Sequence, residues 1–293
     1  MSTEPPALRA RLFVLLQYLL PQHALSRLTG ALAACRTRFV KDWLIRRFIA
    51  AFGVDMREAA EPDPSSYPHF NAFFTRALRP GARPVDITPE ALVSPADGAV
   101  SQAGRIEAGR IVQAKGRWFS AAELLADATD ASRFDGGHFA TIYLSPKDYH
   151  RVHMPCDARL VGLRYIPGQL FSVNGVTADS VPGLFARNER LVCQFETAAG
   201  PMAMVLVGAM IVAGIETVWT GAIAPAGKTV LSIALESDPS ARSIDRGAEM
   251  GRFQLGSTVI LLFPRGAIDW DPLLQPGAPL RMGQRIGRRN AAT

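Results

Sequence analysis

The chain has 293 residues, 48% of them hydrophobic and 20% charged, which indicates a globular protein with a substantial core and excludes a disordered or fibrous chain. Its three cysteines are scattered, so no disulfide framework is expected, and the N-terminus shows no cleavable signal pattern. We therefore expect a reducing, cytoplasmic setting.

The net charge of +6 is concentrated at one end of the chain. Residues 1–50 carry 8 basic and 2 acidic side chains, whereas the rest of the chain carries 24 of each sign. A basic terminal segment on an otherwise balanced protein indicates an anionic partner surface, which is either lipid or nucleic acid.

The N-terminal residues predict amphipathic helices. Residues 8–20 are mostly apolar and end before Pro21, too short a run for the roughly 20 residues that span a bilayer. Between Phe39 and Ile49 apolar residues recur at helical spacing around Trp43, with lysine and arginine between them. Such a helix either lies in a lipid headgroup layer or packs on its own domain. Nucleic acid is disfavoured because the basic residues alternate with bulky aliphatics. We expect a helical membrane-docking segment over residues 1–60.

The rest of the chain, residues 61–293, is expected to form one β-rich domain. A loop over 61–68 precedes a short helix over 69–78 and a Pro/Gly-rich connection. From Leu92 onward, short apolar runs are cut by turns, which is typical of strands. The sequence thus predicts an α+β protein: N-terminal amphipathic helices followed by a sandwich-like or barrel-like body of antiparallel sheets.

Three stretches of this body carry more specific expectations. Residues 202–215, interrupted by Gly208, predict one or two buried strands, and residues 224–250 predict a loop. The β-branched run 258–263, bounded by Pro264, predicts a buried strand.

Gly256 and Ser257 stand at the start of this last run. A glycine lets another group approach its carbonyl closely, so the serine hydroxyl beside it is a candidate for attack on its own backbone. The alternative is an ordinary bulge or turn at the beginning of a strand.

Two histidines and one aspartate are the other candidate site residues. Asp97 lies in a Pro-Ala-Asp-Gly sequence that is equally typical of a plain turn. His150 and His153 also have metal-ligand spacing with Cys156, but Pro155 interrupts the segment, so we expect no metal. A carboxylate, an imidazole and a serine are the groups that activate an oxygen nucleophile. The Gly-x-Ser-x-Gly elbow of α/β-hydrolases is missing.

Several motifs together resemble the bacterial, pyruvoyl-dependent phosphatidylserine decarboxylases. The stretch 249–260, which contains Leu-Gly-Ser-Thr, resembles their processing motif. The similarity runs in the same order over roughly residues 12 to 287 and is weakest over 224–250. The other matching stretches are Phe70–Arg76, Pro95–Gly98, Tyr143–Pro155, Pro167–Asn174, Leu184–Arg190 and Ile215–Trp219.

The resemblance implies two chemical stages. In the first, His153, oriented by Asp97, deprotonates Ser257, which attacks the carbonyl of Gly256. The chain is then cut into residues 1–256 and 257–293, and Ser257 becomes a covalent pyruvoyl group, the cofactor. In the second, this group forms a Schiff base with the amine of phosphatidylserine and accepts the electrons released as CO₂ leaves. The resemblance assigns the protonation of the resulting carbanion to His150.

The resemblance also implies the partners. The substrate lies in an anionic membrane, so we expect peripheral docking on the cytoplasmic face of the cell membrane. Leu170 and Phe171 either line the acyl entrance or belong to an ordinary packed loop. The fragment of residues 257–293 is too short to fold alone, so we expect a heterodimer of the two cleavage fragments. Further dimerisation remains open.

Other functions fit parts of the sequence. A serine hydrolase with the same three residues would keep an intact chain and react at Ser257 with a fluorophosphonate. A carrier module of the lipoyl type would explain residues 279–287, which resemble a hammerhead turn, but no acceptor lysine is present. A membrane-surface adaptor without chemistry leaves the Asp, His and Ser residues unexplained.

Overall fold

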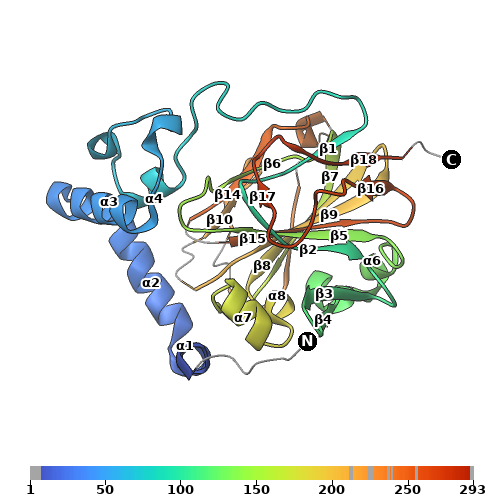
Figure 1. Ribbon diagram of the computed structural model, residues 1–293, viewed down its shortest axis with the longest axis horizontal. Helices are drawn as coiled ribbons and strands as arrows, with labels where there is room; N and C mark the ends of the chain where they lie inside the picture. The colour runs from blue at the N-terminus through green and yellow to red at the C-terminus, as the bar shows by residue number, and fades with distance from the viewer. Residues whose placement is uncertain are drawn as a thin grey trace.

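The computed structural model describes residues 8–210, 214–223, 227–235, 238, 240–254 and 257–290, with only the backbone at Arg9 and Ser257. Helices of the N-terminal segment lie along one side of a body made of antiparallel sheets (Figure 1). The predicted α+β class, a β-rich body preceded by helices, is confirmed.

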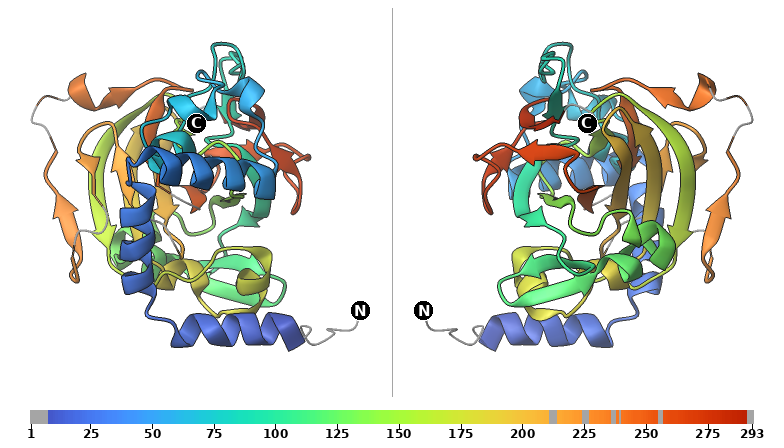
Figure 2. Two further views of the ribbon diagram at one scale, coloured as in Figure 1. Left: turned by 90° about the vertical axis from the view of Figure 1, so that its left-hand side faces the viewer. Right: turned by 90° about the vertical axis from the view of Figure 1, so that its right-hand side faces the viewer.

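The N-terminal segment contains three long helices that follow one another along the outside of the body (Figure 2). The predicted helix around Trp43 is α3, which ends where Gly53 adopts a left-handed φ of 67°. The helix expected over 69–78 is shorter, because it ends after Phe74. The bounds are α1 Leu8–Leu19, α2 Gln22–Ala33, α3 Arg38–Phe52 and α4 Phe70–Phe74, with 3₁₀ turns at Met56–Glu58 and Pro64–Ser66.

The largest sheet has the strand order β12-β7-β8-β9-β15-β5-β2-β17, with β13 also paired to β7. In the part of the chain that the structure describes, β12 and β17 end this order, so the body consists of open sheets and not of a closed cylinder. Its strands are β2 Gly98–Arg105, β5 His138–Leu144, β7 Ala158–Ile166, β8 Arg190–Thr197, β9 Gly200–Val207, β12 Leu231–Ile233, β13 Ser243–Ile244, β15 Ser257–Phe263 and β17 Pro279–Leu280.

Smaller elements surround this sheet. A second sheet has the order β11-β10-β14-β6, a third has β1-β18-β16, and β3 pairs with β4. Their bounds are β1 Ala91–Val93, β3 Arg110–Ala114, β4 Arg117–Ser120, β6 Arg151–His153, β10 Ile215–Thr217, β11 Gly221–Ala222, β14 Glu249–Phe253, β16 Ile268–Trp270 and β18 Arg285–Arg289. The short helices are α5 Ala121–Leu125, α6 Ala128–Ser132, α7 Gly175–Ser180 and α8 Leu184–Arg187, with a 3₁₀ turn at Ser240–Arg242.

The large sheet is buried on both faces, which explains the uninterrupted apolar run of β15. Val259 and Leu261 face a core shared with the two smaller sheets. Ile260 and Leu262 face the opposite core, which α5, α7 and α8 cover. A strand buried on both faces needs apolar residues at every position instead of at alternate ones.

The N-terminal segment has a hydrophobic cluster of its own. Ile45 of α3 is completely buried and packs with Tyr67 and the three phenylalanines of α4. This cluster crosses residue 60, so residues 61–74 pack with the helices although the proposed boundary separates them. The division at residue 60 stays a prediction.

Two sequence expectations about strands are resolved. The apolar stretch 202–215 forms the end of β9 and the beginning of β10, as predicted. The expectation of a loop over 224–250 is wrong for the described parts, because β12, β13 and the start of β14 lie there. These strands are two to five residues long, and such short pairings leave little periodic signal.

Candidate active site

The predicted scissile bond lies at the edge of the described region. Gly256 and the side chain of Ser257 are outside the described residues, and the backbone of Ser257 begins β15 opposite Leu144 of β5. On the other side of the gap, the amide of Phe253 at the end of β14 donates to the carbonyl of His150, at 3.1 Å. The described residues on both sides of the gap therefore contact the segment 144–150.

His150 is a completely buried, neutral base. Its Nε2 lies 3.1 Å from the carbonyl oxygen of Ser145, which can only accept, so Nε2 carries the proton and Nδ1 has a free lone pair. Within the described residues, Nδ1 has no hydrogen-bond partner. The ring stacks on Phe74 with centroids 4.0 Å apart. Burial, with a smaller contribution from the charge of Arg76, lowers the pKa of His150 to about 3.

His153 has the opposite tautomer. Its Nδ1 lies 2.8 Å from the carbonyl of Gly247 and must donate, so the basic nitrogen is Nε2. The hydroxyl of Tyr149 donates to Nε2 at 3.0 Å. Burial lowers the pKa of His153 and raises the pKa of Tyr149 to about 12, so both groups are neutral. The two histidines, which sequence reasoning could not place relative to each other, point to different partners.

Asp97 lies beside these histidines but does not hold either ring. Its carboxylate accepts from Nε of Arg83 at 2.9 and 3.0 Å, from Nη2 of Arg83 at 2.6 Å, and from the amide of Met282 at 2.8 Å. The expected direct contact with His153 is not present, because both ring nitrogens have other partners. The guanidinium fork is a stronger partner for a carboxylate than an imidazole is.

The turn that carries Asp97 is nevertheless joined to β6. The amide of His153 donates to the carbonyl of Pro95 at 2.8 Å, two residues before Asp97. Gly98, next to Asp97, permits the close packing of β2 on β5, because a Cβ there would lie 2.2 Å from the carbonyl oxygen of Tyr143. The structure therefore brings Asp97, His150 and His153 into one region, with Asp97 and His153 linked through the backbone.

Arg83 is a site residue that sequence reasoning missed. Besides Asp97, it binds Glu58 through Nη2 at 2.7 Å, and its side chain is only 6% exposed. The hydrogen bonds to Asp97, its largest influence, raise the pKa of Arg83 above its usual value. Its surroundings, Pro-Gly-Ala-Arg-Pro, indicate only a connection. Tyr149 was likewise missed as the partner of His153.

A polar cleft of about 530 Å³ opens at this region, between the N-terminal segment and the body. Tyr143, Ser145 and Tyr149 line it from the segment that faces the start of β15, and Asp97 lines it from the turn before β2. Part of the wall of the cleft therefore comes from the segment that pairs with the start of β15.

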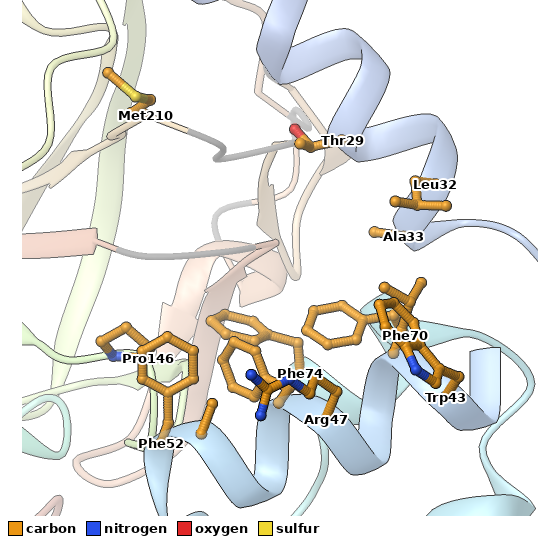
Figure 3. A pocket seen from close by; sticks show the side chains of 13 residues that line it. Thr29, Leu32, Ala33, Trp43, Arg47, Phe52, Phe70, Phe74, Pro146 and Met210 are labelled. Atoms are coloured by element: carbon orange, nitrogen blue, oxygen red, sulfur yellow. The ribbon is translucent and has the colours of Figure 1, made fainter. Parts of the chain in front are cut away.

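An apolar pocket of about 430 Å³ lies between the helices of the N-terminal segment. Side chains of α2 face those of α3 and α4 across its opening (Figure 3). Phe74 and Pro146 belong to its lining, and Phe74 is the ring that stacks on His150. The pocket is therefore connected to the buried histidine through the ring of Phe74.

The two predicted acyl contacts lie elsewhere. Leu170 and Phe171 are buried, and Phe171 packs against Tyr18 of α1 with ring centroids 4.9 Å apart. The amide of Leu170 donates to the side chain of Gln22 at 2.7 Å. Neither residue lines the apolar pocket. Their contact with substrate stays a prediction.

The helices also expose apolar side chains. On α1, Leu8 is 82% and Leu19 is 72% exposed, and on α3, Phe39 is 76% and Trp43 is 64% exposed. Among the described residues, no helix has the length and apolar character needed to cross a membrane.

Comparison with known proteins identifies the family of this chain. The family model described as phosphatidylserine decarboxylase matches residues 70–288, and a model described as PSD matches residues 12–53. A phosphatidylserine decarboxylase proenzyme of Stutzerimonas stutzeri is 57% identical, covering 96% of this chain and 95% of the relative. Proenzymes of the same name from Pseudomonas fluorescens Pf-5 and Azotobacter vinelandii are each 56% identical, covering 96% of this chain and 98% and 99% of the relatives. The chain therefore belongs to the phosphatidylserine decarboxylase family.

Proposed function

We propose that this protein decarboxylates phosphatidylserine to phosphatidylethanolamine, and that His153, His150, Asp97 and Ser257 carry the chemistry. Family membership is the single observation that carries the reaction. As in the family, the carboxy-lyase chemistry uses a pyruvoyl group that self-cleavage makes from a serine. The roles of the individual residues rest on their protonation states and surroundings.

Self-cleavage requires a base for the hydroxyl of Ser257. Nε2 of His153 has the available lone pair, and the hydroxyl of Tyr149 that donates to it has to move aside or pass the proton on. The oxygen of Ser257 then attacks the carbonyl of Gly256, and the peptide bond becomes an ester. Elimination frees the carboxylate of Gly256, and one water molecule completes the release of ammonia, leaving the pyruvoyl group.

Asp97 acts in this step without touching the imidazole. Its negative charge lies next to the turn that holds the backbone of His153, and a nearby carboxylate stabilises the imidazolium that forms. Arg83 and the amide of Met282 keep the carboxylate in place.

The residues around the start of β15 fit a pyruvoyl group at position 257. The backbone there is fixed by pairing with β5, and His150 offers an unused Nδ1 in a buried, water-poor setting. When present, the group supplies an electron sink for the bond to the departing CO₂. His150 is neutral, so it first accepts the proton of the substrate ammonium group and then returns it to the carbon that CO₂ has left.

The N-terminal helices place the enzyme on its substrate. We infer peripheral docking on the cytoplasmic face of an anionic cell membrane, with the exposed leucines of α1 and Trp43 of α3 in the headgroup layer. Each lysine or arginine near such a surface contributes about 1 kcal/mol. An acyl chain of the substrate enters the apolar pocket that ends at Phe74, which places the headgroup toward His150.

Intact mass and a denaturing gel of the purified protein test the cleavage. We expect two pieces, residues 1–256 and 257–293, held together in one heterodimer and releasing CO₂ from phosphatidylserine. Ser257→Ala should give one uncut, inactive chain. The control is Thr258→Val, which removes the neighbouring buried hydroxyl, one without a hydrogen-bond partner among the described residues, and should still be cut. Decarboxylation by the Ser257→Ala chain would contradict the proposal.

A further inference from the structure

Arg76 is a buried cation whose hydrogen-bonding capacity is largely unused. It is 4% exposed and lies just after α4, on the wall of the polar cleft. Its Nη2 donates to the carbonyl of Lys147 at 3.2 Å, and its guanidinium lies 5.5 Å from the ring centre of Phe73. Within the described chain, Nε and Nη1 have no hydrogen-bond partner.

A buried guanidinium with two unpaired donors costs folding free energy unless a bound group pairs with them. Buried donors on a charged group are normally paired, because leaving them unpaired costs the desolvation energy of the group. Burial lowers the pKa of Arg76, which reflects the poor solvation of its charge. An arginine nevertheless stays protonated in proteins. Among the described residues no partner fills these two donors, and an anion from outside would satisfy both the donors and the charge.

In the part of the chain that the structure describes, none of the acidic side chains of the cleft forms an ion pair with Arg76, and the charges of Asp97, Asp148 and Glu58 act on its cation without direct contact. Among the described residues, each of them already has a partner of its own: Asp55 binds Arg57, Glu58 and Asp97 bind Arg83, and Asp148 binds the amide and hydroxyl of Ser145. Of the four cations that line the cleft, Arg83 and Arg281 contact these carboxylates. Arg76 and the exposed Lys147 have no carboxylate partner in the described chain, and they are in direct contact with each other.

The anion site is next to the catalytic base. The turn 145–148 accepts a hydrogen bond from His150 through the carbonyl of Ser145, and one from Arg76 through the carbonyl of Lys147. The charge of Arg76 is close enough to lower the pKa of His150. An anionic group bound to Arg76 therefore lies beside the turn 145–148, which also contacts the imidazole of His150.

We propose that Arg76, with Lys147 at the rim, binds the phosphodiester of the phosphatidylserine headgroup. This assignment rests on the proposed function. The substrate has two anionic groups, and only one suits a fixed cation. The carboxylate loses its charge as CO₂ forms, so an arginine on it would stabilise the ground state more than the transition state. The phosphodiester keeps its charge throughout, and a cation on it anchors the substrate without slowing the reaction.

The two choices predict different kinetics. Removal of a contact that is equal in the ground and transition states raises KM and leaves kcat unchanged. A hydrogen bond to a charged group is worth about 1.5–3 kcal/mol, so Arg76→Gln should raise KM roughly 10- to 150-fold. Arg76→Lys keeps the charge and should recover part of this loss.

The assay uses dihexanoyl phosphatidylserine below its micelle concentration, with enzyme shown by gel to be fully cleaved. Arg79→Gln is the matched control, because Arg79 lies three residues further on and is exposed, and KM should not change. sn-Glycero-3-phosphoethanolamine, which has the phosphodiester but no carboxylate, should inhibit the wild type and lose at least tenfold in affinity with Arg76→Gln.

The outcomes distinguish failure of the phosphodiester site from failure of the proposed function. A lower kcat with unchanged KM, or inhibition that Arg76→Gln does not weaken, would overturn the phosphodiester site while leaving decarboxylation by the wild type intact. If Arg76→Gln is not cleaved, binding of sn-glycero-3-phosphoserine is compared by calorimetry in Ser257→Ala chains with and without Arg76→Gln. Equal affinity in those two chains would also overturn the site. A wild type that releases no CO₂ would instead refute the proposed function.

Discussion

The buried ion pair between Arg83 and Asp97 gives a quantitative prediction about stability. The two side chains are 6% and 9% exposed, and Arg83 also holds the partly buried Glu58. Arg83→Met keeps much of the side-chain volume and removes the charge. Among the described residues, Asp97 then retains only the amide of Met282 as a partner, and its charge remains in a poorly solvated place.

The size of the effect follows from this geometry. Removing one partner of a buried pair costs about 3–5 kcal/mol, because the remaining charge is uncompensated. For a chain of this size, we expect Tm to fall by about 5–8 °C. The comparison is Arg281→Met, since Arg281 is 69% exposed and lies 3.6 Å from Glu58 alone. An exposed pair is worth up to about 1 kcal/mol.

Both variants are best measured in the Ser257→Ala background, so that every sample is one uncut chain. Thermal unfolding followed by circular dichroism gives Tm, and urea titration at 25 °C gives the free energy of unfolding. If Arg83→Met and Arg281→Met are equally stable within 1 kcal/mol, Asp97 does not depend on Arg83 for its position, and the reasoning is refuted.

Two further predictions concern the buried histidine and the docking helices. In the Ser257→Ala chain, the free energy of unfolding should fall by several kcal/mol as pH drops from about 6.5 toward 3, because the unfolded imidazole takes up a proton that His150, with a pKa lowered to about 3, resists. Urea titrations between pH 4 and 7 should show a smaller fall for His150→Asn, and an identical slope would contradict the burial argument. Replacing Phe39 and Trp43 together by serine should weaken binding to phosphatidylglycerol vesicles at least tenfold, since a buried aromatic side chain contributes about 1.5–3 kcal/mol. Sedimentation with the vesicles measures this binding. The control Trp118→Ser, at an exposed position on β4, should bind normally, and unchanged binding of the double variant would exclude these residues from docking.

The sequence predicted the elements whose periodicity reflects burial. The run 258–263 is a strand because every one of its side chains is buried, and α3 shows its helical period because Ile45 faces the phenylalanines of α4. The short strands β12 and β13 were missed, since edge pairings of two or three residues impose no pattern on the sequence.

The sequence predicted which residues belong to the candidate site, but not how they contact one another. Motifs named Asp97, His150 and His153, but the tautomer of each imidazole depends on carbonyls far from it in sequence, such as that of Gly247. The orienting role expected of Asp97 toward His153 stays a prediction, and the sequence did not indicate that its carboxylate binds Arg83, whose charge has no local signal in a Pro/Gly-rich connection. The unpaired donors of Arg76 likewise could not be predicted from the sequence, because they are recognised only after every neighbouring carboxylate has been assigned to its own partner.

The position of β15 also means that the chain has to fold before it is cut. The proposed fragment 257–293 places β15 between β5 and β9, β17 beside β2 and β18 beside β1, so it is interleaved with strands of the larger fragment. Before the cut, this interleaving is an intramolecular folding reaction. After the cut, recovery from denaturation would need two separate molecules to meet, and its rate would depend on protein concentration. The covalent connection is thus required once, during the first folding, and the mature protein persists through slow unfolding instead of ready renaturation.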